Sequence, residues 1–185
     1  KHYQDDYSSF ERIDILHSSE MNENIYKKTW NKKPIVLGNW STENKGKILV
    51  NKIANMQTDF QFQNLSVYPQ NNNIKDFISR KQNAYVNADI FLQLSLSEGN
   101  SYATLDALLC GLPVVASNVG LFYKDIPDDC FVKVEWEKNN DLEYVLEKIN
   151  YAWQNKDVLS KNAREWYINN CSFEKWKHKM KNVIK

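Results

Sequence analysis

Short apolar runs alternate along the chain with longer stretches in which apolar residues recur every three or four positions. The short runs are bounded by Gly, Pro or Asn, which is typical of buried strands, and they predict strands over 34–38, 60–67, 88–94, 112–116 and 131–134. The helical spacing predicts helices over 45–56 and 74–85, one that ends at 110, and three more after 139. Strands that alternate with helices indicate an α/β fold, with a Rossmann-like parallel sheet flanked by helices.

Two regions differ in this pattern. Residues 1–33 are polar and weakly periodic, and we interpret them as a linker or incoming segment in which 13–16 is a candidate strand. Residues 34–185 carry the strand and helix pattern and are expected to form one domain with C-terminal helices. The last of these helices places lysines beside Phe173, Trp176 and Met180. We expect its apolar side to pack on the domain, with attachment to a membrane surface as the alternative.

Composition narrows the function classes. The chain has 185 residues, 24 basic and 23 acidic side chains and a net charge of +1, so it lacks the basic footprint of a nucleic-acid-binding domain. The three cysteines have no close spacing, which argues against a disulfide framework or a zinc site, and Cys110 is expected to be a buried thiol. No apolar run is long enough to span a membrane and no signal peptide is evident, so we expect a cytoplasmic protein.

Two acids bracket a loop that follows the predicted strand 88–94. The stretch from Glu98 to Asp106 reads EGNSYATLD and leads into a predicted helix. In an open parallel sheet, ligands bind at the carboxyl ends of the strands. A helix that begins there offers backbone N–H groups to oxygen-rich ligands. This stretch is therefore the first candidate for a ligand site.

Further short motifs accompany this stretch in a fixed order. They are Leu37-Gly38, Lys45-Gly46, Ala88-Asp89-Ile90-Phe91, Ser95-Leu96-Ser97-Glu98-Gly99, Asp106-Ala107, the run from Cys110 to Ser117, and Val119-Gly120. In this combination the chain resembles the C-terminal, donor-binding half of retaining glycosyltransferases of the GT-B fold, the group 1 family. The resemblance covers most of the chain. It implies that 34–185 is a nucleotide-sugar-binding Rossmann-like domain, one half of a GT-B fold.

The resemblance also implies roles for three charged residues. Glu98 would act in catalysis by hydrogen bonding the hydroxyls of the donor sugar, and Asp106 would hold the ribose hydroxyls. A carboxylate suits a pair of neighbouring hydroxyls because it accepts two hydrogen bonds. Lys45, at the start of a helix, would place its charge on the diphosphate.

The backbone around Glu98 is expected to complete the donor site. Gly99 would let the main chain approach the sugar closely. The amides of Asn100, Ser101 and Tyr102 lie where a helix begins and would meet phosphate or sugar oxygens. We expect contacts to the base from the loop around 68–74.

Three residues depart from the family pattern. Asn39 stands where the family often has a basic residue, so Asn39 is only a candidate diphosphate contact and Lys45 would carry more of that role. Asp106 replaces the usual Glu and is one methylene shorter. Asn100 replaces the usual Phe, which changes the pocket beside the sugar and leaves the sugar's identity open.

The resulting hypothesis is a retaining hexosyltransferase domain. It would bind a donor such as a UDP- or GDP-sugar, need no cofactor and no metal, and transfer the sugar to a hydroxyl of a glycan or lipid-linked acceptor. The acceptor would be bound largely by an N-terminal domain outside this chain, so the isolated fragment is expected to bind donor with little transfer. Two alternatives remain: a non-catalytic nucleotide-sugar-binding or partner domain, and a GT-B sugar-nucleotide epimerase.

Overall fold

The computed structural model describes residues 16, 18–27, 29–56, 58–65 and 73–183. Its strands are β1 (Ile35–Gly38), β2 (Gln61–Asn64), β3 (Ile90–Gln93), β4 (Val114–Ser117) and β5 (Val132–Val134). Its α-helices are α1 (Lys47–Ala54), α2 (Ile74–Asn87), α3 (Tyr102–Cys110), α4 (Leu121–Lys124), α5 (Leu142–Gln154), α6 (Lys156–Cys171) and α7 (Phe173–Val183), with short 3-10 helices η2 (Glu43–Lys45) and η3 (Trp136–Lys138). The five predicted strands are confirmed, and α4 is an addition. Most of the candidate strand at 13–16 lies outside the described residues.

The five strands form one parallel sheet in the order β2-β1-β3-β4-β5. The α/β, Rossmann-like prediction is therefore confirmed. The chain moves from β1 to β2 on one side and then returns to place β3 on the other side of β1. This reversal makes the carboxyl ends of β1 and β3 the point at which ligands bind in sheets of this strand order.

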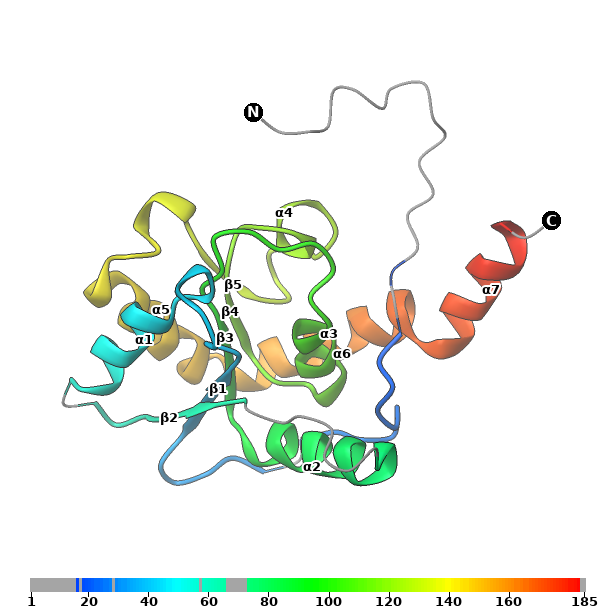
Figure 1. The fold of residues 1–185 in the computed structure, drawn as a ribbon, viewed down its shortest axis with the longest axis horizontal. Helices are drawn as coiled ribbons and strands as arrows, with labels where there is room; N and C mark the ends of the chain where they lie inside the picture. The colour runs from blue at the N-terminus through cyan, green and yellow to red at the C-terminus, as the bar shows by residue number, and fades with distance from the viewer. Residues whose placement is uncertain (1–15, 17, 28, 57, 66–72, 184–185) are drawn as a thin grey trace, which may run out of the picture.

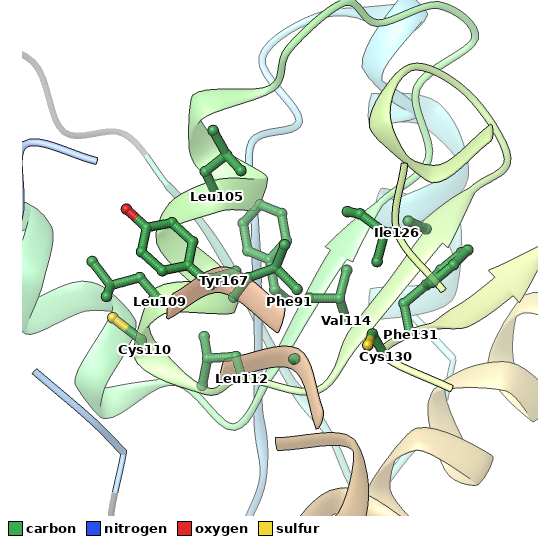
Figure 2. Packing of buried hydrophobic residues seen from close by; sticks show 14 of the residues in the cluster. Phe91, Leu105, Leu109, Cys110, Leu112, Val114, Ile126, Cys130, Phe131 and Tyr167 are labelled. Atoms are coloured by element: carbon green, nitrogen blue, oxygen red, sulfur yellow. The ribbon is translucent and has the colours of Figure 1, made fainter. Parts of the chain in front are cut away.

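Apolar residues bury both faces of the central strands. On one face, Val36, Ile90 and Val115 pack with α1 and α5. On the other face, Phe91 and Val114 pack with α3 and α6. Figure 2 shows this second cluster, in which Tyr167 of α6 lies against the residues of α3. Burial on both faces explains why these strands appear in the sequence as continuous apolar runs.

Two elements are less buried than their sequences suggested. β2 forms an edge of the sheet and its side chains are half-buried or exposed. α7 has no buried residue, and Phe173 is 51% exposed. Figure 1 shows α7 standing away from the sheet beyond α6. The expectation that its apolar side packs on the domain is met only in part, because Trp176 and Met180 are half-buried and no residue of the helix is fully buried. No helix among the described residues is long and apolar enough to cross a membrane.

The carboxylate of Asp89 fixes the start of β1 beside β3. Lys27 Nζ lies 3.1 Å from Asp89 Oδ1, and both side chains are almost fully buried. The backbone N–H groups of Asn31 and Ile35 donate to Asp89 at 2.9 and 2.7 Å, and the Asn31 side chain donates at 2.8 Å. This one side chain therefore attaches the segment 27–35 to the amino end of the sheet. The assignment of 1–33 to a linker stays a prediction.

Asp89→Ala is expected to lower the free energy of unfolding by about 3–5 kcal/mol, because it leaves the Lys27 ammonium buried without its counterion. Glu165→Ala is the matched control, since it breaks an exposed pair with Lys161 on α6 and should cost at most about 0.5 kcal/mol. Urea unfolding measures both changes. An equal loss in the two variants would contradict the role given to Asp89.

The three cysteines should be unreactive in the folded protein. Cys110, Cys130 and Cys171 are all buried, which confirms the expectation for Cys110. Burial raises the pKa of each thiol to about 12. At pH 8 the thiolate fraction should therefore be lower than that of a free cysteine by on the order of a thousandfold. A disulfide reagent should modify the thiols only after urea unfolding; rapid modification of the native protein would contradict this burial.

Candidate functional site

Lys45 and Glu98 meet at the point where the strand order reverses. Lys45 ends η2, in the connection that follows β1, and Glu98 lies in the loop that follows β3. Lys45 Nζ lies 3.3 Å from Glu98 Oε1, and Ser95 Oγ donates to the same oxygen at 2.7 Å. The Glu98 side chain is 14% exposed and that of Lys45 is 35% exposed. Both contacts use Oε1, which leaves Oε2 to accept a hydrogen bond from a ligand.

The backbone holds these two loops together. The N–H of Leu96 donates to the carbonyl oxygen of Asn44 at 2.8 Å. Gly46 follows Lys45 with φ of 79°, a left-handed conformation that ends η2. A Cβ atom at Gly46 would lie 2.8 Å from Leu94 Cβ. The Lys45-Gly46 motif thus serves two purposes: the lysine faces Glu98, and the glycine allows close approach of the two loops.

The N-terminus of α3 is capped by Ser101. Ser101 Oγ accepts from the N–H of Thr104 at 3.4 Å and donates to Gln93 Oε1 at 3.0 Å. The Ser101 hydroxyl is therefore structural, and a ligand contact through its backbone amide stays a prediction. The neighbours Asn100 and Tyr102 are exposed, so a ligand can reach their backbone.

Gly99 and Gly120 lie beside one another at the Glu98 loop and have opposite surroundings. A Cβ atom on Gly99 would meet no atom within 4 Å, so the space over it is open. A Cβ atom on Gly120 would lie 2.5 Å from the Gly99 carbonyl oxygen and 2.9 Å from that of Glu98. Gly120 also has φ of 59°. Gly120 therefore supports the loop from behind, and Gly99 presents a surface that a ligand can occupy.

Asp106 is held in a buried ion-pair network. Its side chain is fully buried on α3. Lys81 Nζ from α2 lies 2.6 Å from Asp106 Oδ2, and Ser19 Oγ donates to Asp106 Oδ1 at 2.5 Å. Lys81 also pairs with Glu20. A ribose contact by Asp106 stays a prediction, and it would require the ligand to share or replace one of these partners.

Burial and charge oppose each other within this network. Burial raises the pKa of Asp106, although the attraction of Lys81 works against the rise. Burial alone would lower the pKa of Lys81, but the negative charges of Asp106 and Glu20 outweigh it and the pKa is raised. Lys81 therefore remains protonated at neutral pH.

Two pockets are lined by the candidate residues and their neighbours. The smaller one, about 190 Å³, is lined by Asn39, Leu65, Phe77, Lys81, Tyr85, Tyr102, Ala103 and Asp106. The larger one, about 730 Å³, is lined by Leu96, Ser97, Glu98, Asn118, Val119, Gly120, Tyr123, Glu135, Trp136 and Glu137. The predicted residues thus divide between them: Asn39, Tyr102 and Asp106 belong to the smaller pocket and Glu98 to the larger. Most of the loop expected to contact the base, 68–74, lies outside the described residues.

The sequence did not indicate Lys81 and Trp136, which line these pockets, or the buried side chain of Trp40. Lys81 has no motif around it, and only the packing of α2 on α3 brings it to Asp106. Trp40 and Trp136 are anchored through their indole N–H groups, which donate to the carbonyl oxygens of Leu92 at 3.1 Å and Leu96 at 3.3 Å. For the two tryptophans, the sequence offered one signal, which was the high number of tryptophans in the chain, 6 in all.

One family model matches the chain. The model described as "Glycosyl transferases group 1" matches residues 44–153, which include Lys45, Glu98 and Asp106. A search of curated proteins found no match.

Solved structures show the same fold. A glycosyltransferase from Rickettsia africae aligns with a TM-score of 0.61 and 19% identity. The alignment covers 83% of this chain and 47% of the Rickettsia chain. A TarM mutant from S. aureus, in complex with fondaparinux, α-GlcNAc-glycerol and UDP, has a TM-score of 0.65 and 17% identity, with coverages of 91% and 38%. The C-terminal domain of a glycosyl transferase group 1 family protein, LpcC from Francisella tularensis, has a TM-score of 0.52 and 14% identity, with coverages of 86% and 97%. The chain thus spans less than half of the first two proteins and nearly all of the third.

The two glycines should respond oppositely to alanine. Gly120→Ala is expected to lower the free energy of unfolding by about 1–3 kcal/mol, because it combines a left-handed backbone with a clash against the Glu98 loop. Gly99→Ala meets open space and should leave stability within about 0.5 kcal/mol of wild type. Thermal and urea unfolding compare the two. A large loss for Gly99→Ala would show that the space over Gly99 is not open.

Proposed function

Since the chain belongs to the glycosyl transferases group 1 family, we propose that its site binds a nucleotide-diphosphate sugar and takes part in transferring the sugar to a hydroxyl with retention of anomeric configuration. The observation that carries the proposal is the Lys45–Glu98 pair at the reversal of strand order, beside the open surface of Gly99. It combines a cation for phosphate with a carboxylate for sugar hydroxyls in one place. The UDP in the similar TarM structure supports a nucleotide donor.

Each residue has a distinct part in this proposal. Lys45 exchanges its contact with Glu98 for one with the diphosphate, or shares its three N–H donors between the two. Glu98, kept in place by Ser95, accepts hydrogen bonds from the sugar hydroxyls through Oε2. Backbone N–H groups at the start of α3 stabilise the negative charge that develops on the leaving diphosphate. These donors fit a mechanism that needs no metal ion.

The transfer exchanges one bond for another at the anomeric carbon. The bond from this carbon to the diphosphate oxygen breaks, and the acceptor oxygen bonds to the same carbon. The acceptor's proton passes to the leaving diphosphate, so the products are a glycoside and a nucleoside diphosphate. Because the chain spans less than half of several similar structures, the acceptor and the complete reaction belong to the proposal for the whole protein.

A nucleotide-binding experiment separates the two roles. Isothermal titration would compare UDP, GDP and dTDP with their sugar conjugates. Lys45→Met should weaken the nucleotide and its sugar conjugate alike, by about tenfold to a hundredfold, because a charge-assisted contact to phosphate contributes about 1.5–3 kcal/mol. Glu98→Gln should leave the nucleotide bound at least as tightly, because it frees Lys45 from its carboxylate partner, and should remove the added affinity of the sugar conjugate. Lys52→Met, on the exposed last turn of α1, is the charge-matched control.

The outcomes are distinct. If no nucleotide sugar binds the wild-type chain, the donor proposal is wrong. If donors bind but Lys45→Met and Lys52→Met behave alike, the site is misassigned. If donors bind as expected and a protein containing both halves transfers no sugar, the chain is the non-catalytic nucleotide-sugar-binding domain that was the alternative.

A further inference from the structure

The larger pocket beside Glu98 has a composition that the donor's diphosphate does not explain. Its lining comes from the loops after β3, β4 and β5, which lie along one edge of the sheet in Figure 1. Three of its lining residues are glutamates, Glu98, Glu135 and Glu137, and none of the described lining residues is basic. Such a pocket repels phosphates and other anions. Lys133 lies 3.9 Å from Glu135 Oε1 and Lys45 lies 3.3 Å from Glu98 Oε1, so these two lysines offset part of this charge and Glu137 keeps the pocket acidic.

The same pocket exposes apolar side chains that a soluble domain would ordinarily cover. Trp136 is 51% exposed, Tyr123 53% and Leu96 42%. Trp136 is also held in place, because its indole N–H donates to the carbonyl oxygen of Leu96. This bond ties η3 to the loop that carries Glu98, so the ring is presented to the pocket as a fixed surface. Aromatic rings with an anchored polar end are common at binding surfaces of this mixed kind.

A buried acceptor in the pocket lacks a donor. Asn118 Oδ1 is shielded from solvent, and no donor among the described residues reaches it. Because this oxygen is shielded from solvent, a ligand reaches it only if the Asn118 side chain turns toward the pocket. The acceptors that the pocket presents directly are the carboxylates of the exposed residues Glu135 and Glu137, beside an apolar face.

We propose that this pocket is a subsite for an uncharged saccharide, the sugar unit of the acceptor, which stacks on Trp136 and donates hydroxyl hydrogen bonds to Glu135 and Glu137. A sugar ring has hydroxyl donors around its rim and apolar C–H groups on its faces, which matches acceptors around an aromatic ring. The volume of about 730 Å³ lies within the usual range of small-molecule sites. The inference rests on the proposed function and adds that this domain itself selects a carbohydrate acceptor.

The arrangement also separates the two substrates by charge. The diphosphate is drawn to Lys45 and the start of α3, whereas the pocket lined by Glu98, Glu135 and Glu137 disfavours it. Glu98 stands at the boundary, where the donor's anomeric carbon and the acceptor hydroxyl must meet.

Saturation-transfer NMR with the methyl glycosides of glucose, galactose and N-acetylglucosamine tests the subsite. At least one should bind the wild-type chain, and Trp136→Ala should weaken it by about tenfold or more. Tyr151→Ala, which removes a similarly exposed aromatic ring (54% exposed) on α5, should have no effect. Glucose 6-phosphate should bind the wild-type chain more weakly than methyl glucoside does. Its affinity should rise in the double variant Glu135→Gln/Glu137→Gln, which removes two negative charges from the pocket.

Titration with UDP distinguishes failure of the subsite from failure of the donor site. UDP should bind wild type and Trp136→Ala equally, and a bound UDP-sugar should leave methyl glycoside binding in place. If UDP binds but no methyl glycoside does, or if Trp136→Ala and Tyr151→Ala act alike, the subsite is wrong. If the UDP-sugar displaces the glycoside, the pocket holds the donor's own sugar and the acceptor assignment is overturned. If UDP itself does not bind, it is the donor proposal that fails.

Discussion

The buried carboxylate of Asp89 is the interaction on which the arrangement of the sheet depends. A charge removed from water needs several partners, and Asp89 takes them from Lys27, Asn31 and the first residue of β1. These contacts set the start of β1 against the start of β3 at the amino end of the sheet. Because β1 and β3 pair in parallel, fixing their starts also fixes where they end. The ends are where Lys45 and Glu98 face each other, so a structural ion pair at one edge of the sheet positions the Lys45–Glu98 pair at the other.

The functional edge is organised by close backbone approach rather than by side-chain packing. Gly46 brings η2 against Leu94, and Gly120 brings the loop after β4 against the carbonyl groups of Glu98 and Gly99. A loop enclosed from two sides by main chain has little freedom to move, which preorganises Glu98. Lys45 and Ser95 then hold the same carboxylate oxygen, so the orientation of Glu98 is set before any ligand arrives.

Charge is unevenly distributed around this edge. Lysines pair with two of the acids: Lys45 contacts Glu98, and Lys81 pairs with Asp106 in the lining of the smaller pocket. Glutamates and an anchored tryptophan line the larger pocket. A net charge near zero for the whole chain conceals this division, so composition gave no information about it.

The sequence by itself determined the strands, most helices, and the pairing of an acid-bearing loop with a lysine-bearing loop. It could do so because doubly buried strands are continuous apolar runs and because the order of motifs along the chain is local information. Tertiary structure alone decided that Lys81 encloses Asp106 and that Trp136 reaches Leu96, because these contacts join residues 25 and 40 positions apart through the rotation of a helix and the path of a loop. It also decided that α7 is only partly buried. An apolar stripe along a helix indicates a face that favours burial, but it does not indicate which surface will cover that face.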